Sequence, residues 1–235
     1  MCIRDRCANG WNATLHAAKN GHKNILNFLL GINVRFTLSS ESKRTALHIA
    51  CDNGHFDACK VIIDNCPSLL NEVDYKGRHA GHFAARSGNM DILTYLETMM
   101  DVTKKTDNGM NILHMACLHC HIKMCAYIIN KYPYLNIQKT KRGWTTAHFV
   151  ANRGNNRGNE IEMFKILLNA VEKVEFETLT KSGNSVLTLA VQCNDYDFVE
   201  YLLRFHSELL NIPNANNPRE TDDNEMKSIL DKYIS

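Results

Sequence analysis

The feature that most constrains this chain is a short pattern that recurs six times at nearly regular spacing. Each copy places a small residue before a helical run of apolar and small side chains. The copies occupy residues 10–22, 43–55, 77–89, 109–121, 143–155 and 183–195, and their sixth positions lie 33, 34, 32, 34 and 40 residues apart. A repeat of about 33 residues cannot bury its apolar face alone, so we expect a stack of similar repeats.

The ends of the first helix in each repeat can be placed from individual residues. A short side chain bearing an oxygen can accept the first free backbone N–H groups of a helix. Such residues precede the helix in five copies, at Asn12, Thr45, Asn111, Thr145 and Ser185, whereas His79 is the exception. The residue that closes the helix is expected to be left-handed, as Gly21, Gly54, Gly88, Gly154 and Asn194 allow. Cys120 holds this position in the fourth repeat and should cost about 1 kcal/mol.

This pattern resembles the ankyrin repeat, whose signature is Gly-x-Thr-Pro-Leu-His-x-Ala-Ala-x-x-Gly-His. Residues 43–55 match it most closely, and the resemblance covers roughly residues 8–212. It implies an all-α, ankyrin-type solenoid of stacked helix-turn-helix units, each preceded by a β-turn or hairpin finger. The family proline is absent from all six copies, so each helix start lacks a stiffening residue.

The repeats set the expected domain organisation. Residues 1–9 are an N-terminal leader, residues 10–212 the repeat domain, residues 213–224 a polar linker and residues 225–235 a C-terminal cap helix. The repeats run over about 10–42, 43–75, 76–107, 108–140, 141–180 and 181–212. The fifth repeat carries an insertion between its helices, with Arg153 and Arg157 as further contact candidates. Alternate repeats end in a common segment, and its leucines Leu70, Leu135 and Leu210 are expected to tuck beneath the stack.

Composition excludes several functional classes. Lys and Arg exceed Asp and Glu by 27 − 25 = 2, which offers no basic face large enough for nucleic acid. No run of about 18 apolar residues and no signal-peptide pattern occurs, so we expect a cytoplasmic, intracellular protein without membrane insertion. The nine cysteines are odd in number and lie mostly in apolar segments, which suits a reducing compartment.

Motifs that carry chemistry are scarce. The chain has no Ser, His and acid arrangement, phosphate-binding glycine loop or HExxH motif, so we expect no enzyme activity, cofactor or small-molecule substrate. One cluster could hold zinc or respond to oxidation, and it comprises Cys117, His119, Cys120, His121 and Cys125. Three of these positions hold the same residue type in the second repeat, so structural roles are favoured and no metal is expected. A metal- or redox-responsive switch is the alternative.

The surface of the stack offers the remaining candidates. The finger tips and the exposed ends of the first helices form a ladder on the concave side, a surface that solenoids use for binding. Trp, Arg and Met are enriched at the energetic centres of protein interfaces. The candidate protein-binding residues are Trp11, Arg44, Asp52, Arg78, Arg86, Met110, Leu118, Trp144, Asn152 and Asn184.

The sequence therefore predicts a non-catalytic module that binds a partner protein through this ladder, as a scaffold or adaptor does. The resemblance implies protein recognition as the general activity. A regulatory fragment of a larger enzyme, adaptor or channel is a further alternative, because the first repeat begins close to the start of the chain.

Overall fold

The computed structural model describes residues 11–32, 41–153, 159–169, 178–213, 216–218 and 220–233. These residues form thirteen α-helices and three 3-10 helices and contain no β-strand, so the predicted all-α repeat fold is confirmed. The chain divides into two compact units, an N-terminal unit of residues Met1–Met115 and a C-terminal unit of residues Ala116–Ser235. The leader expected at residues 1–9 lies outside the described residues.

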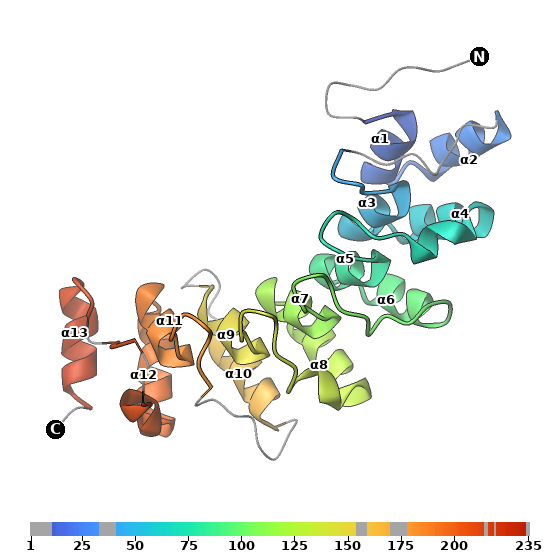
Figure 1. Ribbon diagram of the computed structural model, residues 1–235. Coiled ribbons are helices and arrows are strands. Elements are labelled where there is room, and N and C mark those ends of the chain that lie inside the picture. The colour runs from blue at the N-terminus through green and yellow to red at the C-terminus, as the bar shows by residue number, and fades with distance from the viewer. Residues whose placement is uncertain are drawn as a thin grey trace. The chain divides into compact units, whose positions relative to one another are not determined.

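The N-terminal unit contains three complete helical pairs (Figure 1). These are α1 (Ala13–Lys19) with α2 (Lys23–Gly31), α3 (Ala46–Asp52) with α4 (Phe56–Asn65), and α5 (Ala80–Ser87) with α6 (Met90–Glu97). The 3-10 helix η1 (Pro67–Asn71) follows α4, and α7 (Ile112–Leu118) begins in this unit. The first helices α1, α3 and α5 pack side by side, as do the second helices α2, α4 and α6, so each pair stacks on the next.

The C-terminal unit continues the same arrangement after α7. Its elements are α8 (Ile122–Lys131), η2 (Pro133–Leu135), α9 (Thr146–Ala151), α10 (Glu160–Asn169), α11 (Val186–Gln192), α12 (Tyr196–Phe205), η3 (Ser207–Asn211) and α13 (Asn224–Asp231). The first helices α9 and α11 pack together, and α10 lies between α8 and α12. Helix α13 packs on α12, at the end of the row of second helices.

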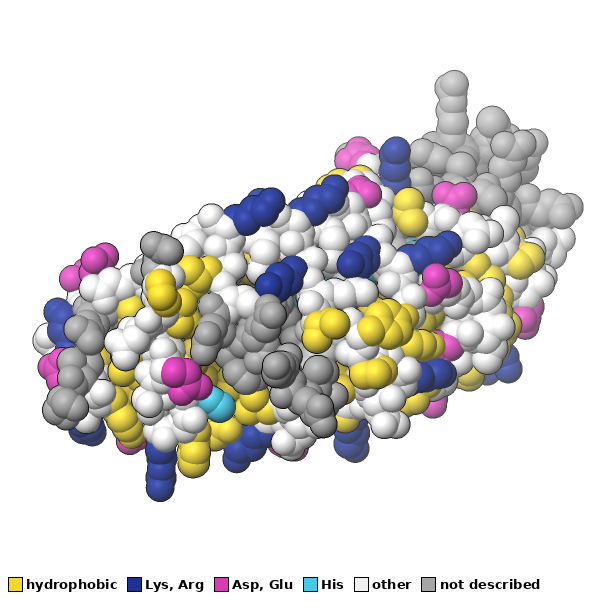
Figure 2. Space-filling view, turned by 60° about the horizontal axis from the view of Figure 1, so that its bottom comes forward, with side chains coloured by type: hydrophobic (Ala, Val, Ile, Leu, Met, Phe, Trp, Pro, Cys, Tyr) yellow, Lys and Arg dark blue, Asp and Glu magenta, His cyan; other side chains and the backbone are white. Residues whose placement is uncertain are grey.

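The core has small side chains on the first helices and larger ones on the second helices. Ala50 and Ala84 are fully buried on α3 and α5, whereas Leu93 and Phe164 fill the space around α6 and α10. The Phe164 and Phe198 rings meet edge to face with their centroids 5.3 Å apart. Small residues let the first helices approach closely, and the second helices supply most of the buried volume. Figure 2 shows that hydrophobic side chains also reach the surface, where they lie among Lys and Arg.

The leucines that close alternate repeats differ partly from the prediction. Leu135 is buried as expected, but in the second and sixth repeats the buried residues are Leu69 and Leu209, whereas Leu70 and Leu210 are half-buried. The inward leucine is the third residue of the 3-10 helix in all three segments, but in η1 and η3 one more residue separates it from the following Asn than in η2. An alignment on that Asn therefore shifts the inward-facing position by one residue.

The predicted caps at the starts of the first helices are present. The side chains of Asn12 and Asn111 each accept a hydrogen bond from the backbone N–H three residues later, and Thr45, Thr145 and Ser185 do the same. The prediction that His79 is an exception is wrong. Its Nδ1 accepts a hydrogen bond from the Gly81 N–H at 3.1 Å, so an unprotonated imidazole nitrogen replaces the usual oxygen.

The predicted left-handed residues after the first helices are also confirmed within the described part of the chain. Gly88 has a φ of 72°, Asn194 has a φ of 53° and Cys120 has a φ of 57°. Gly154, which was expected to play this part in the fifth repeat, lies outside the described residues. A left-handed backbone is unfavourable for a residue with a Cβ atom, so Cys120 is a strained position.

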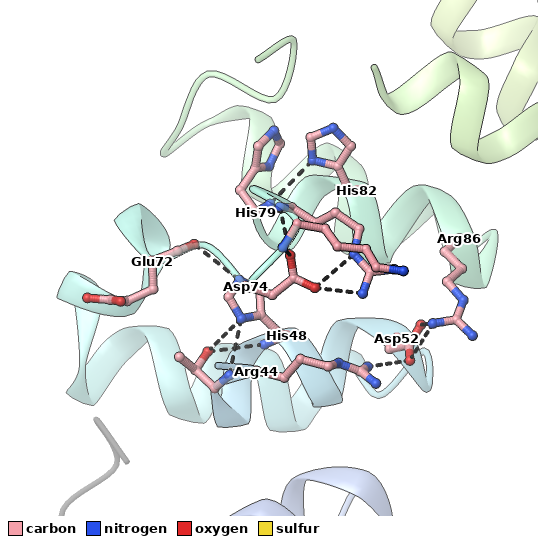
Figure 3. A network of polar contacts seen from close by, with 11 residues as sticks. Arg44, His48, Asp52, Glu72, Asp74, His79, His82 and Arg86 are labelled. Carbon is pink, nitrogen blue, oxygen red and sulfur yellow. Dashed lines mark hydrogen bonds and ion pairs between the residues drawn. The ribbon is translucent and has the colours of Figure 1, made fainter. Parts of the chain in front are cut away.

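Buried histidines connect successive repeats. The Nδ1 atom of His48 accepts a hydrogen bond from the backbone N–H of Thr45 (3.1 Å), and its Nε2 lies 3.1 Å from the carbonyl oxygen of Glu72 (Figure 3). His148 makes the same pair of contacts, from the Thr145 N–H (3.2 Å) and to the Asn184 carbonyl (3.3 Å). An acceptor at Nδ1 places the ring proton on Nε2, which donates to the carbonyl.

The other repeats show how general this connection is. His82 Nε2 lies 3.2 Å from the carbonyl oxygen of Met110. Thr188 replaces histidine in the sixth repeat, and its hydroxyl donates to the carbonyl oxygen of Asn216 at 3.0 Å. An uncharged side chain, imidazole or hydroxyl, donates to the carbonyl group in these repeats, whereas Leu15 holds this position in the first repeat and has no donor.

The two histidine contacts together require a neutral imidazole, because a protonated Nδ1 cannot accept the backbone N–H. Burial lowers the pKa of His48 and of His148 to about 4, and it lowers the pKa of His82 as well. Unfolding exposes these rings, which then take up protons near pH 6.5. Between pH 6.5 and 4 the unfolded chain binds more protons than the folded chain, so stability is complete above this window and is lost as the pH falls through it.

Replacing Cys120 with Gly should raise the free energy of unfolding by about 1 kcal/mol, because Gly adopts the left-handed backbone without a Cβ penalty. Urea denaturation followed by circular dichroism measures the change. The control is Cys193→Gly at the end of α11, where φ is −90° and Gly should destabilise the chain. A Cys120→Gly variant that is less stable than the parent would contradict the left-handed assignment.

Replacing His148 with Thr, on the pattern of Thr188, should make stability less sensitive to acid. Lowering the pH from 7.5 to 5.5 costs the parent about 1 kcal/mol for each buried imidazole of pKa about 4, and the variant lacks one such site. Urea denaturation at both pH values gives the difference. The exposed His22→Gln variant is the control and should lose as much stability as the parent. An equal loss in His148→Thr would show that the imidazole does not fold in its neutral form.

Candidate functional site

The candidate ladder residues lie on short turns and on the ends of the first helices. In the described fingers, the residue four positions before the tip holds the tip in place. Thr140 Oγ1 accepts the N–H of Trp144, and Thr180 Oγ1 accepts the N–H of Asn184, both at 3.0 Å. The equivalent contacts link Thr106 to Met110 and Asp74 to Arg78. These four residues were not predicted, although a Thr or Asp four positions before each tip could have indicated them.

Neighbouring fingers are joined through the backbone within each unit. In the N-terminal unit the Tyr75 N–H donates to the carbonyl oxygen of Ser42 (3.2 Å), and the Asp107 N–H donates to that of Lys76 (3.0 Å). In the C-terminal unit the Lys181 N–H donates to the carbonyl oxygen of Arg142 at 2.9 Å. The fingers are therefore tight turns in register, from which the tip side chains project at fixed positions.

Four of the predicted site residues of the N-terminal unit come together in one polar network (Figure 3). Asp52, at the end of α3, pairs with Arg44 from the preceding finger and with Arg86 from α5, whose Nη1 lies 3.2 Å from Asp52 Oδ1. The Arg78 side chain binds Asp74 Oδ2 through Nε (2.9 Å) and Nη2 (2.6 Å). The guanidinium carbons of Arg44 and Arg78 each lie 4.7 Å from the centre of the Phe83 ring.

The charges of this network are largely satisfied within it. Burial alone would raise the pKa of the Asp74 carboxyl, but hydrogen bonds from the Arg78 side chain and from the Arg78 and Lys76 N–H groups outweigh burial and lower that pKa. Asp74 is therefore charged at neutral pH and fixes Arg78. Asp52 serves two arginines in the same way, so this surface presents ordered guanidinium groups beside an aromatic ring.

The two tryptophans lie against their own repeats. The Trp144 ring packs 5.1 Å from the Phe149 ring and 6.2 Å from the His148 ring, measured between centroids, and is half-buried. Trp11 lies 5.1 Å from the His16 ring and beneath the Lys19 ammonium group at 5.8 Å. Each Trp therefore packs on the helix that follows it and still exposes part of its ring.

The remaining predicted residues differ in exposure. Met110 and Asn184 are half-buried at finger tips, and their carbonyl oxygens lie at the histidine connections described above. Asn152 is exposed at the end of α9, and Leu118 is half-buried at the end of α7. Arg153 Nη1 donates to the Leu118 carbonyl oxygen at 2.7 Å, so this arginine holds two helix ends together. Arg157, the other candidate in the insertion, lies outside the described residues.

The structure does not bring the side chains of the Cys and His cluster together as a set of ligands. Throughout the described ranges, no three His, Cys, Asp or Glu side chains converge in a way that could hold a metal ion. Cys117 Sγ lies 3.7 Å from Cys125 Sγ, and Cys51 Sγ lies 3.5 Å from Cys59 Sγ at the equivalent place in the second repeat. All four are buried, and burial raises the pKa of the Cys125 thiol. These thiols pack as small apolar groups and are shielded from oxidants.

The helices of the described residues are all too short and too polar to cross a bilayer.

Family models for ankyrin repeats match most of the chain. A model of ankyrin repeats in three copies matches residues 2–68 and 133–214. A model of ankyrin repeats in many copies matches residues 47–97, and a model of a single ankyrin repeat matches residues 108–137. The matched ranges coincide with the helical pairs and fingers described above.

Curated relatives share the repeats within otherwise different proteins. The chain is 28% identical over 118 residues to transient receptor potential cation channel subfamily A member 1 of Homo sapiens, covering 49% of the chain and 10% of the channel. It is 27% identical over 174 residues to the probable E3 ubiquitin-protein ligase XBOS32 of Oryza sativa subsp. japonica, covering 60% and 35%. It is 26% identical over 97 residues to the serine/threonine-protein kinase TNNI3K of Mus musculus, covering 40% and 12%.

The chain thus spans about a third or less of these relatives, and what it has in common with them is the repeat segment. The repeated helical pairs, the stacked fingers and the matching family models agree. This chain belongs to the ankyrin-repeat family.

Proposed function

We propose that this chain is a non-catalytic module that binds a partner protein through its inner face, defined as the finger tips together with the exposed ends of the first helices. The observation that carries the proposal is the fixed presentation of the tips. Each described finger from the third to the sixth is closed by a Thr or Asp side chain, and backbone hydrogen bonds join adjacent fingers within each unit. A preorganised surface loses little conformational entropy on binding.

The residue types on the inner face also support protein recognition. Arg44 and Arg78 are held beside Phe83, and Arg86 is paired with Asp52. Trp144 keeps part of its ring exposed in the C-terminal unit. Arg and Trp are the types that most often carry the binding energy of an interface, because they bury a large area and add directed contacts. Ordered side chains of these types are suited to anchor a partner.

The relatives favour recognition over catalysis as the role of this segment. One is named as a channel, one as a ligase and one as a kinase, so no single activity accompanies the repeats. We infer that the segment acts as a scaffold or adaptor in a reducing, cytoplasmic compartment, in keeping with its free buried thiols. It needs no cofactor for this role and serves equally well within a longer protein.

Replacing Trp144 with Ala should weaken binding of a partner by about 30-fold, because loss of one interface anchor costs about 2 kcal/mol. The measurement is affinity capture from a cell extract, followed by titration of each captured protein against the parent and the variant. Tyr134→Ala is the control, because Tyr134 is an exposed aromatic residue in η2, away from the fingers. Circular dichroism verifies that both variants are folded.

The proposal requires the two variants to differ. A partner that binds the parent and Tyr134→Ala equally, and Trp144→Ala more weakly, supports the inner face as the binding surface. Partners that bind Trp144→Ala as tightly as the parent would contradict it.

A further inference from the structure

The fifth and sixth fingers of the C-terminal unit are rich in cations. Residues 136–152 and 178–194 hold the fifth and sixth fingers with α9 and α11, and neither stretch includes an Asp or a Glu. Their fingers carry four exposed cations, namely Lys139, Lys141, Arg142 and Lys181. In the N-terminal unit, Arg44, Arg78 and Arg86 are paired with Asp52 and Asp74.

The fifth and sixth fingers hold these cations close together. The Lys181 N–H donates to the carbonyl oxygen of Arg142 at 2.9 Å, which places the tips of the two fingers side by side. A Cβ atom added to Gly143 would lie 3.2 Å from the backbone nitrogen of Lys181 and 3.3 Å from the carbonyl oxygen of Leu179, so the two turns are in close contact. The spacing between the cationic side chains is therefore set by backbone packing.

The sixth finger contacts a segment that lies farther along the chain. Asn184 receives a hydrogen bond from Asn216 Nδ2 at 2.6 Å, and the Asn216 N–H donates to the carbonyl oxygen of Gly183 at 2.7 Å, so an asparagine forms the next layer. Asp223 caps α13 and accepts a hydrogen bond from Tyr196 on α12 at 2.8 Å.

Because the Debye length is about 8 Å at physiological salt, exposed positive charges on two touching turns act on a ligand as a group. Electrostatic complementarity mainly sets which partner is selected and how fast it associates. Trp144 lies at the tip of the fifth finger and offers one apolar contact beside this charge. The matching ligand carries several carboxylates and at least one apolar side chain.

We propose that the fingers of the C-terminal unit bind an acidic, extended segment of the partner protein, with Lys141, Arg142 and Lys181 facing its carboxylates and Trp144 facing an apolar residue. This inference rests on the proposed function and specifies the chemistry of its partner. A nucleic acid fits less well, because backbone recognition of that kind commonly uses about six to ten phosphate contacts.

The test uses the full chain and a fluorescein-labelled peptide of about 12 residues with alternating Glu and a central Leu, which extended spans about 40 Å. A second peptide has Gln in place of every Glu. Fluorescence anisotropy should show binding of the Glu peptide only, and binding should weaken as NaCl is raised from about 50 to about 300 mM. Equal binding of both peptides would overturn the proposal.

Variants locate the binding surface. Lys141→Gln/Arg142→Gln should weaken binding of the Glu peptide by about fivefold or more, because two of the four cations are lost. The matched control in the N-terminal fingers is Lys76→Gln/Lys105→Gln, which should bind as the parent does. Equal affinities of the two double variants would overturn the assignment to the C-terminal unit.

Other anionic ligands and the cellular partner complete the test. Single-stranded DNA of equal charge and phosphatidylserine vesicles are titrated in parallel, and tighter binding of either than of the Glu peptide would overturn the proposal in favour of that class. A captured partner that depends on Trp144 but not on Lys141 and Arg142 would leave the proposed function standing and overturn this inference. Partners whose binding does not depend on Trp144 either would contradict both the proposed function and this inference.

Discussion

Buried imidazoles hold successive repeats together by accepting a hydrogen bond at one ring nitrogen and donating one at the other, which only the neutral ring can do. His48, His82 and His148 use Nδ1 to complete the start of their own first helix and Nε2 to reach a backbone carbonyl farther along the chain. A single repeat cannot bury its apolar face, so contacts between repeats determine whether the chain folds. One buried imidazole therefore contributes both to the start of its own helix and to the stacking of the next repeat.

The inner face follows from this connection. Two of the carbonyl groups that receive the histidine hydrogen bond belong to finger tips, Met110 and Asn184, so the helix start beneath also positions the turn above it. Thr and Asp side chains then close the third to sixth turns, and backbone hydrogen bonds join neighbouring turns within each unit. The side chains available to a partner therefore project from parts of the fold that have little freedom to move. This is the physical basis for assigning recognition to this face.

The repeat, the helix starts and the left-handed position of Cys120 were predictable, because each depends on a few neighbouring residues. The cap at His79 was not, since an imidazole nitrogen stands where a short oxygen-bearing side chain is expected. The burial of Leu69 and Leu209 was missed because the length of a 3-10 turn shifts the inward position by one residue. The pairing of Asp52 with Arg86 joins residues 34 positions apart, which becomes visible only once the repeats are stacked.

The buried histidines His48 and His148 are neutral and carry their proton on Nε2. Long-range proton–nitrogen NMR spectra of the histidine rings, recorded from pH 7.5 to 4.5, measure the tautomer and the protonation of each ring directly. The structure predicts that His48 and His148 show the Nε2–H tautomer and remain neutral until the pH approaches about 4, as long as the chain is folded. The Nδ1–H tautomer at these positions, or protonation near pH 6.5 in the folded chain, would contradict the account.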